Sequence, residues 1–417
     1  MSSEPGAGHY FEFYSWKALG EIMVDVVNGT EGDDTINGAW PGRTPGNDEI
    51  INGLGGDDVL GGLGGDDTLN GGDGNDVLRG GLGSDILDGG NGDQDWADFS
   101  DKTVSVVATL NGATDSIVTV GGVAEDTIRN VEYLRGGSAD ETLTGDDQTN
   151  FLRGNGGADA LDGGGGTDFA DYIAATSGVT VSLANPSINT GEAAGDAFIS
   201  IEGIRGSNFD DVLIGDENNN FLRGGLGADT LNGGDGSDWA DYHSAAGGLT
   251  VSLANPGINT GEAAGDTYTS IENIQGSTFD DVLIGDASTN FLRGGSGADA
   301  LDGGGGADWA DYFNAAEAVT ASLTKPSVNT GEAVGDTYTS IENIRGSAFN
   351  DTLDGDDNNN MFRGAGGNDA INGGNGIDTA IFSGNRASYT LTDLGHGSVQ
   401  VFGADGTDTL IGIEKLQ

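Results

Sequence analysis

Residues 53–88 read GLGGDDVLG GLGGDDTLN GGDGNDVLR GGLGSDILD, four copies of one nine-residue pattern without a gap. Glycines open each copy, an Asp stands sixth and an aliphatic residue stands eighth. The first six residues predict a tight turn, because glycine accepts positive φ and close backbone approach, and the last three predict a short strand. Two copies make one coil, so stacked coils form two parallel sheets around a narrow core. We expect that core to contain Val59, Leu69, Leu78, Leu87, Leu213, Leu222 and Leu231.

A second repeat has a period of 70 residues and begins at Gly136, Gly206, Gly276 and Gly346. Each unit opens with four nonapeptides, and a spacer of 34 residues such as 242–275 follows. In the spacers, VSLANP predicts a strand and a turn and DTYTSIENI a second strand, so they continue the solenoid as wider coils. Degenerate end units suit the caps that a solenoid needs. The expected divisions are 1–28 (N-terminal cap segment), 29–98 (first nonapeptide array), 99–135 (degenerate spacer), 136–205, 206–275 and 276–345 (three 70-residue units), 346–381 (last nonapeptide array) and 382–417 (C-terminal cap).

The composition excludes several classes of partner. The 417 residues include 68 Asp and Glu against 15 Lys and Arg, a net charge of −53 that disfavours nucleic acid and anionic membranes. No apolar stretch is long enough to span a membrane, and Met1–Gly8 lacks the features of a cleaved secretion signal. Cys is absent, which removes disulfides and thiolate metal sites. High charge with little hydrophobic content normally predicts disorder, so we expect bound cations to offset the charge.

The stacking of these two-nonapeptide coils places acidic side chains side by side. It sets Asp58 beside Asp76 and Asp67 beside Asp85, and it pairs 211 with 229, 281 with 299 and 351 with 369. A divalent ion between two carboxylates turns repulsion into coordination, and oxygen ligands on a flexible turn favour Ca²⁺ over Mg²⁺, while Zn²⁺ would require His or Cys. We expect about ten or more calcium ions. The candidate ligands are Asp34, Asp58, Asp67, Asp76, Asp85, Asp159, Asp168, Asp211, Asp229, Asp238, Asp281, Asp299, Asp308, Asp351, Asp369 and Asp378.

Some turns depart from the pattern. Glu141 takes the sixth position opposite Asp159. The second nonapeptide of each 70-residue unit carries a neutral Asn there, so we expect weaker or partly occupied sites. These are Asn150, Asn220, Asn290 and Asn360, which face Asp168, Asp238, Asp308 and Asp378. Nothing in the spacing requires Asp196, Asp266 or Asp336, although they stay candidates for further ions.

Alternatives exist for several of these features. Two carboxylates can act as the acid and nucleophile of a glycosidase, but many equivalent turns single out no pair. His243 corresponds to Ile173 and Phe313 in neighbouring units, which favours a tolerated surface position over a catalytic one. Phe169, Trp239 and Trp309 favour packing against the spacer, with sugar stacking as the alternative, and the segment 10–27 is either a cap or a partner-binding patch.

The GGxGxDxUx arrays resemble the RTX (hemolysin-type) calcium-binding repeats of proteins exported by type I secretion. The spacers, GLTVSLANP followed by GDTYTSIENIQGSTFDDVLIGD, resemble the longer units of that superfamily. This resemblance implies an all-β, right-handed parallel β-roll or β-solenoid with calcium in its turns. It also implies export through an uncleaved C-terminal signal, and therefore an extracellular or cell-surface bacterial protein.

The function expected from these features is a calcium-dependent structural, surface or interaction module. No HExxH, GxSxG, phosphate-loop or thiol motif occurs, so we expect no enzymatic activity, no nucleic-acid partner and no membrane insertion. The alternatives are a polysaccharide-active protein or its appendage and a surface-layer or adhesin component. Cell-surface polysaccharide and self-association are therefore the candidate interactions besides calcium.

Overall fold

A computed structural model describes residues 25–37 and 46–417. Most of the expected N-terminal cap, residues 1–28, lies outside the described residues. The chain forms two compact units: unit 1 extends to Ala175 and includes Val179–Arg205, and unit 2 contains Thr176–Gly178 and Gly206–Gln417. In the described ranges, no helix has the length and apolar character needed to cross a bilayer.

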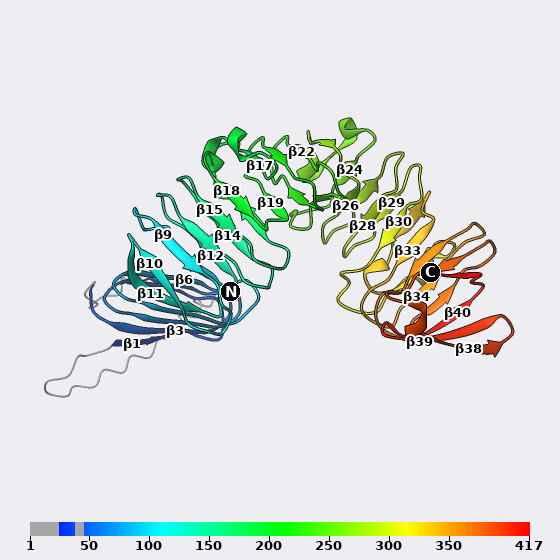
Figure 1. Ribbon diagram of the computed structural model, residues 1–417, viewed down its shortest axis with the longest axis horizontal. Helices are drawn as coiled ribbons and strands as arrows, with labels where there is room; N and C mark the ends of the chain where they lie inside the picture. Colours follow the sequence, from blue (N-terminus) through cyan, green and yellow to red (C-terminus); the bar gives the residue numbers. More distant parts are fainter. Residues whose placement is uncertain (1–24, 38–45) are drawn as a thin grey trace, which may run out of the picture. The chain divides into compact units, whose positions relative to one another are not determined.

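Each unit is a right-handed parallel β-roll, as expected from the sequence. In unit 1 most strands alternate between two sheets, and most pairs of successive coils are parallel (Figure 1). Leu60 pairs with Leu78 and Leu69 with Leu87, so one coil takes up two nonapeptides. The elements of unit 1 are β1 (Asp25–Asn28), β2 (Thr35–Asn37), β3 (Glu49–Gly55), β4 (Val59–Gly64), β5 (Thr68–Asp73), β6 (Val77–Leu82), β7 (Ile86–Asn91), β8 (Trp96–Asp98), β9 (Val106–Thr109), β10 (Ser116–Val120), β11 (Val123–Arg129), β12 (Tyr133–Arg135), β13 (Thr142–Thr144), β14 (Phe151–Arg153), β15 (Ala160–Asp162), β16 (Phe169–Asp171), β17 (Thr180–Ser182), the 3₁₀ helices η1 (Pro186–Ile188) and η2 (Gly191–Ala193), β18 (Ala197–Ile199) and β19 (Gly203–Arg205).

Unit 2 repeats the same coil, and most of its strands have three residues. Leu213 pairs with Leu231, and Leu283 with Leu301, again two nonapeptides apart. Its elements are β20 (Val212–Ile214), β21 (Phe221–Arg223), β22 (Thr230–Asn232), β23 (Trp239–Asp241), β24 (Thr250–Ser252), η3 (Pro256–Ile258), η4 (Gly261–Ala263), β25 (Thr267–Thr269), β26 (Asn273–Gln275), β27 (Val282–Ile284), β28 (Phe291–Arg293), β29 (Ala300–Asp302), β30 (Trp309–Asp311), β31 (Thr320–Ser322), η5 (Pro326–Val328), η6 (Gly331–Ala333), β32 (Thr337–Thr339), β33 (Asn343–Arg345), β34 (Thr352–Asp354), β35 (Met361–Arg363), β36 (Ala370–Asn372), β37 (Thr379–Ala380), η7 (Arg386–Ser388), β38 (Thr390–Gly395), β39 (Ser398–Gly403), β40 (Gly406–Ile411) and β41 (Lys415–Leu416).

The spacers depart from a simple nonapeptide coil. DTYTSIENI forms two strands, β25 and β26, where the sequence predicts one. The break falls at Ser270, whose φ of 47° cannot continue an extended strand. As a result β25 pairs with β22 in one sheet and β26 with β23 in the other, so the spacer completes one widened coil. Antiparallel strands also occur, in β9–β11 of the spacer 99–135 and in β38–β40 near the end of unit 2.

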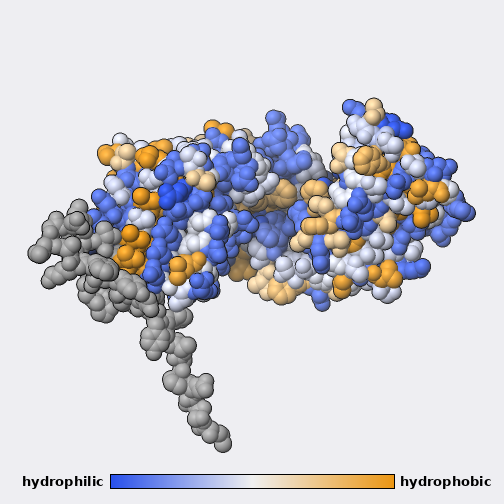
Figure 2. All heavy atoms as spheres, turned by 90° about the horizontal axis from the view of Figure 1, so that it is seen from below, coloured by the Kyte–Doolittle hydropathy of each residue, from blue (hydrophilic) through white to orange (hydrophobic). Residues whose placement is uncertain are grey.

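The core consists of inward-facing side chains from successive coils, most of them aliphatic, together with buried aromatic residues such as Tyr172, Tyr242 and Tyr312. Leu69, Leu78 and Leu87 are fully buried, and so are Leu213, Leu222 and Leu231. The assignment of Val59 to the core is wrong, because it is 44% exposed while Leu60 occupies the eighth position and is buried. On the face shown in Figure 2, hydrophilic and hydrophobic residues are interspersed.

Candidate metal sites in the turns

The sixth residues of successive coils are joined by a repeated hydrogen bond. The amide of Asp58 donates to Oδ1 of Asp76 over 2.8 Å, and that of Asp67 donates to Oδ1 of Asp85 over 2.8 Å. The structure also brings together the predicted pairs of unit 2: 211 with 229, 281 with 299 and 351 with 369, at 2.8 to 2.9 Å. In each pair, Oδ1 of the later residue therefore accepts a hydrogen bond from a backbone amide.

The other oxygen of many turn carboxylates has no hydrogen-bond partner in the described part of the chain. These unpaired turn oxygens are fully buried, which costs free energy when the carboxylate is ionised. Among the candidate ligands they belong to Asp58, Asp67, Asp76, Asp85, Asp159, Asp168, Asp229, Asp238, Asp299, Asp308 and Asp378.

In the candidate ligands, each unpaired turn oxygen lies over the first glycine of its own nonapeptide. A methyl group built on Gly71 would lie 2.1 Å from Oδ2 of Asp76 and 2.4 Å from the carbonyl oxygen of Gly89 on the next coil. At Gly233 the corresponding atoms are Oδ2 of Asp238, at 2.3 Å, and the carbonyl oxygen of Ser270, at 2.1 Å. A carboxylate oxygen and a carbonyl oxygen thus meet above one glycine, which has no side chain to separate them.

Electrostatics at these turns disfavours the ionised state. Burial, and then the nearby Glu202 and Asp146, raise the pKa of Asp168 to about 7. Burial, with Asp266 and Asp211 close by, raises the pKa of Asp229 to about 8. Burial and Asp159 likewise raise the pKa of Glu141. A cation at the turn oxygens would reverse this effect by stabilising the carboxylates.

The donor set fits a hard divalent cation. In the described ranges no three Asp, Glu, His or Cys side chains converge on one point, so a bound ion would take its remaining ligands from backbone carbonyls. Carboxylate and carbonyl oxygens on a flexible loop suit calcium. The carboxylates with unpaired turn oxygens are the residues that would hold it, and the ion would supply the missing positive partner.

Five candidate ligands lack an unpaired turn oxygen. Ser277 donates from its amide (2.6 Å) and its hydroxyl (3.0 Å) to Oδ2 of Asp281, and Ser207 and Ser347 do the same for Asp211 and Asp351. Thr30 plays this part for Asp34. These four carboxylates already have protein donors. Asp369 is the fifth candidate ligand without an unpaired turn oxygen.

The asparagines occupy the same position over a glycine but bring their own donor. A methyl group on Gly285 would lie 2.2 Å from Oδ1 of Asn290. The Nδ2 of Asn290 donates to the carbonyl oxygen of Glu272 over 2.7 Å, and Asn360 bonds Glu342 in the same way. This arrangement supports the prediction of weaker sites at the asparagines, which stays a prediction.

The hydrogen bonds between turn carboxylates link them into two columns. Several carboxylates of these columns do not lie two nonapeptides from their partner. The amide of Asp85 donates to Asp126, 41 residues ahead, and that of Asp76 donates to Asp95; both acceptors carry an unpaired turn oxygen. Three spacer aspartates accept from a partner 37 residues earlier: Asp196, Asp266 and Asp336. In the other column the acceptors are glutamates, which bond the amides of Asp95, Asp168, Asp238, Asp308 and Asp378: Glu132, Glu202, Glu272, Glu342 and Glu414. The recurrence of GD at this constant distance after 159, 229 and 299 is a signal that could have found the spacer aspartates.

The other residues singled out from the sequence have structural contacts. His243 is half exposed, and its Nδ1 lies 2.7 Å from Arg223 and 3.2 Å from Asp241. Trp239 and Trp309 are nearly buried and stack on Phe221 and Phe291. Phe169 stacks on Phe151 in the same way.

Comparison with protein families agrees with this geometry. The family model for the RTX calcium-binding nonapeptide repeat matches residues 20–40, 46–78, 61–93, 135–170, 205–240, 275–310 and 342–380, which together cover just over half of the chain. No curated protein matches the sequence. The repeats, the parallel rolls and the buried turn carboxylates therefore have one explanation: the chain is a calcium-binding β-roll protein and belongs to the RTX calcium-binding nonapeptide repeat family.

Proposed function

We propose that the protein is exported unfolded, folds when it meets extracellular calcium and then serves as a structural, surface or interaction module. The observation that supports this most is the set of buried, unpaired turn oxygens. A metal-free roll buries carboxylates that lack partners and resist ionisation, whereas a calcium-loaded roll gives each of them a cation.

The difference in calcium across the cell envelope would set the direction of folding. Extracellular calcium modules bind with dissociation constants of about 10⁻⁴ to 10⁻³ M. In calcium-poor cytosol such sites stay empty, so the chain remains open and fit for export. At a free calcium concentration tenfold above the dissociation constant, each independent site adds about 1.4 kcal/mol to the stability of the fold.

We also propose that the protein serves this role without enzymatic activity. In the described ranges the turn carboxylates recur at a strict period, which supports a repeated structural role rather than a single acid and base pair. The family and the calcium argument both support export and a surface location.

Circular dichroism of the full chain tests the proposal. We expect little β signal in chelator, a cooperative gain as calcium rises through the millimolar range, and no comparable gain with magnesium or with sodium at equal ionic strength. A full β signal in chelator that calcium leaves unchanged would refute it.

A further inference from the structure

A row of arginines ends the second nonapeptide of each 70-residue unit. Each of the first three lies beside an aspartate two nonapeptides further along the chain. In unit 2, Arg223 is 2.7 Å from Asp241 and Arg293 is 2.6 Å from Asp311. In unit 1, Arg153 pairs with Asp171. The aspartates are buried, so each of these guanidiniums has an internal carboxylate partner.

The fourth member of the row lacks this partner. Arg363 ends β35, and the corresponding position two nonapeptides later is Ile381. The amide of Ile381 donates to the carbonyl of Phe362 over 2.8 Å, which places it on the neighbouring coil where the other units carry Asp. Arg363 is exposed, and no described residue forms an ion pair with it.

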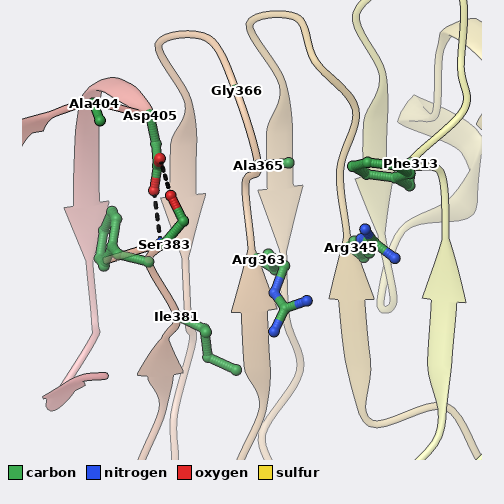
Figure 3. Close-up of a pocket in the computed structure, with 10 residues that line it drawn as sticks. Phe313, Arg345, Arg363, Ala365, Gly366, Ile381, Ser383, Ala404 and Asp405 are labelled. Carbon is green, nitrogen blue, oxygen red and sulfur yellow. Dashed lines mark hydrogen bonds between the residues drawn. The ribbon is translucent and has the colours of Figure 1, made fainter. Parts of the chain in front are cut away.

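Arg363 lines a pocket of about 520 Å³ that lies within unit 2 (Figure 3). Arg345 lines it as well, on the adjacent strand β33, with its guanidinium 3.7 Å from the ring centre of Phe313. The Nε of Arg345 is buried without a hydrogen-bond partner, and its nearest contact to Asp311 is 3.8 Å. Burial lowers the pKa of Arg345, and the neighbouring positive charge of Arg363 lowers it further.

The acidic residue of this pocket is already engaged. Asp405 accepts hydrogen bonds from the amide of Ser383 over 2.8 Å and from the hydroxyl of Tyr389 over 2.8 Å, and also from the Ser383 hydroxyl. Figure 3 shows its carboxylate turned toward Ser383. The two guanidiniums therefore share a pocket whose own carboxylate serves another contact.

We propose that this pocket binds an organic carboxylate that carries a ring, and that the ligand's carboxylate takes the place of the missing aspartate beside Arg363. The other three arginines of the row each pair with an aspartate, so a carboxylate fits the position beside Arg363. A guanidinium can hold a carboxylate through two parallel hydrogen bonds. Phe313, which is 43% exposed, offers a surface for the ring, together with Ile381 and Phe382. The inference concerns the folded protein and does not depend on the proposed function.

Isothermal titration calorimetry on the full chain in millimolar calcium tests this site with two probes. D-glucuronate represents an acidic sugar and benzoate an aromatic acid, with glucose and benzamide as their neutral counterparts. We expect binding of at least one acid near one equivalent per chain and none of the neutral compounds. The acid that binds identifies the kind of ring that the pocket prefers.

Two substitutions decide whether Arg363 is responsible. Arg363→Gln should weaken binding about tenfold or more, the loss expected for a charged hydrogen bond. Ile381→Asp restores the internal partner found in the other units, so it should abolish binding without lowering the melting temperature. Ile377→Asp adds the same charge at an exposed position outside the pocket and should leave binding unchanged. Absence of binding by both acids, equal binding of the neutral compounds, or binding that survives both Arg363→Gln and Ile381→Asp would overturn the proposal.

Discussion

The amide of Asp229 donates to Oδ1 of Asp266 over 2.8 Å, although the two residues lie 37 positions apart. The other oxygen of Asp266 accepts from the buried hydroxyl of Tyr242 over 2.7 Å. The spacer thus continues the column of turn carboxylates and ends it with a protein donor. Within this repeat, Asp229 is left with an unpaired turn oxygen between two carboxylates that have protein donors.

This relationship predicts the effect of removing one hydroxyl. Tyr242→Phe should lower the free energy of unfolding in calcium by about 1 to 3 kcal/mol, because it leaves a buried carboxylate oxygen unpaired. Chemical denaturation measures the loss. Tyr268→Phe is the control, since Tyr268 contacts Tyr242 and Asn259 but not the carboxylate. A smaller loss in Tyr242→Phe than in the control would contradict this assignment.

A matched pair in one nonapeptide tests the turn sites. Asp238→Asn removes the charge of a buried carboxylate with an unpaired turn oxygen, and Asp235→Asn makes the same change at an exposed side chain earlier in the same turn. We expect Asp238→Asn to bind about one calcium fewer and to need more calcium for folding. Asp235→Asn should behave like the parent chain. Equilibrium dialysis and a calcium titration measure both quantities, and equal behaviour of the two variants would count against the sites.

The glycine beneath each turn oxygen gives a steric test. Gly71→Ala places a methyl group 2.1 Å from Oδ2 of Asp76, so the turn must shift, and we expect a loss of about 1 to 3 kcal/mol in calcium. Gly156→Ala, also in unit 1, meets no atom within 4 Å and should have little effect. Thermal unfolding of both variants compares them. Equal stability would show that the space above Gly71 is not needed.

The pH dependence without calcium has a definite sign. Burial raises the pKa of Asp58 to about 6 and that of Asp229 to about 8 in the folded, metal-free chain, from 3.8 in the absence of the fold. Groups whose pKa is raised by folding stabilise the fold below their unfolded pKa, and this contribution is lost as pH rises through the folded pKa. Metal-free β structure should therefore decrease between about pH 4 and pH 8.

Calcium should reverse this trend. Protons compete with the ion for the same oxygens, so calcium affinity should rise over the pH range in which the metal-free fold weakens. Circular dichroism and calcium titrations at pH values on either side of about 7 measure both effects. Metal-free β structure that grows with pH would show that the turn carboxylates are not buried as described.

Sequence reasoning reached the repeat, the roll and the facing of Asp58 with Asp76, because all three follow from a strict period. It placed Val59 in the core because it took the wrong member of the strand as the inward residue. It also took DTYTSIENI as one strand, since nothing in the letters announces the left-handed Ser270. Local alternation alone does not reveal such a break.

The sequence predicted only part of the set of turn carboxylates, because the prediction used one fixed spacing. A rule of two nonapeptides per coil cannot reach Asp126, which lies in the antiparallel strand β11, 41 residues after its partner Asp85. Nor can it show that Ser277 satisfies Asp281 while Asp299 stays unpaired, because both aspartates fit the same pattern. The difference depends on which donor lies in the second position of the turn.

Anomalous diffraction from crystals grown in calcium tests directly whether the turns hold calcium. We expect peaks within about 2.3 to 2.6 Å of the unpaired turn oxygens, including those of Asp95 and Asp126, and weak peaks or none at Asn220, Asn290 and Asn360. Peaks confined to exposed carboxylates such as Asp235, with none beside the unpaired turn oxygens, would contradict this expectation.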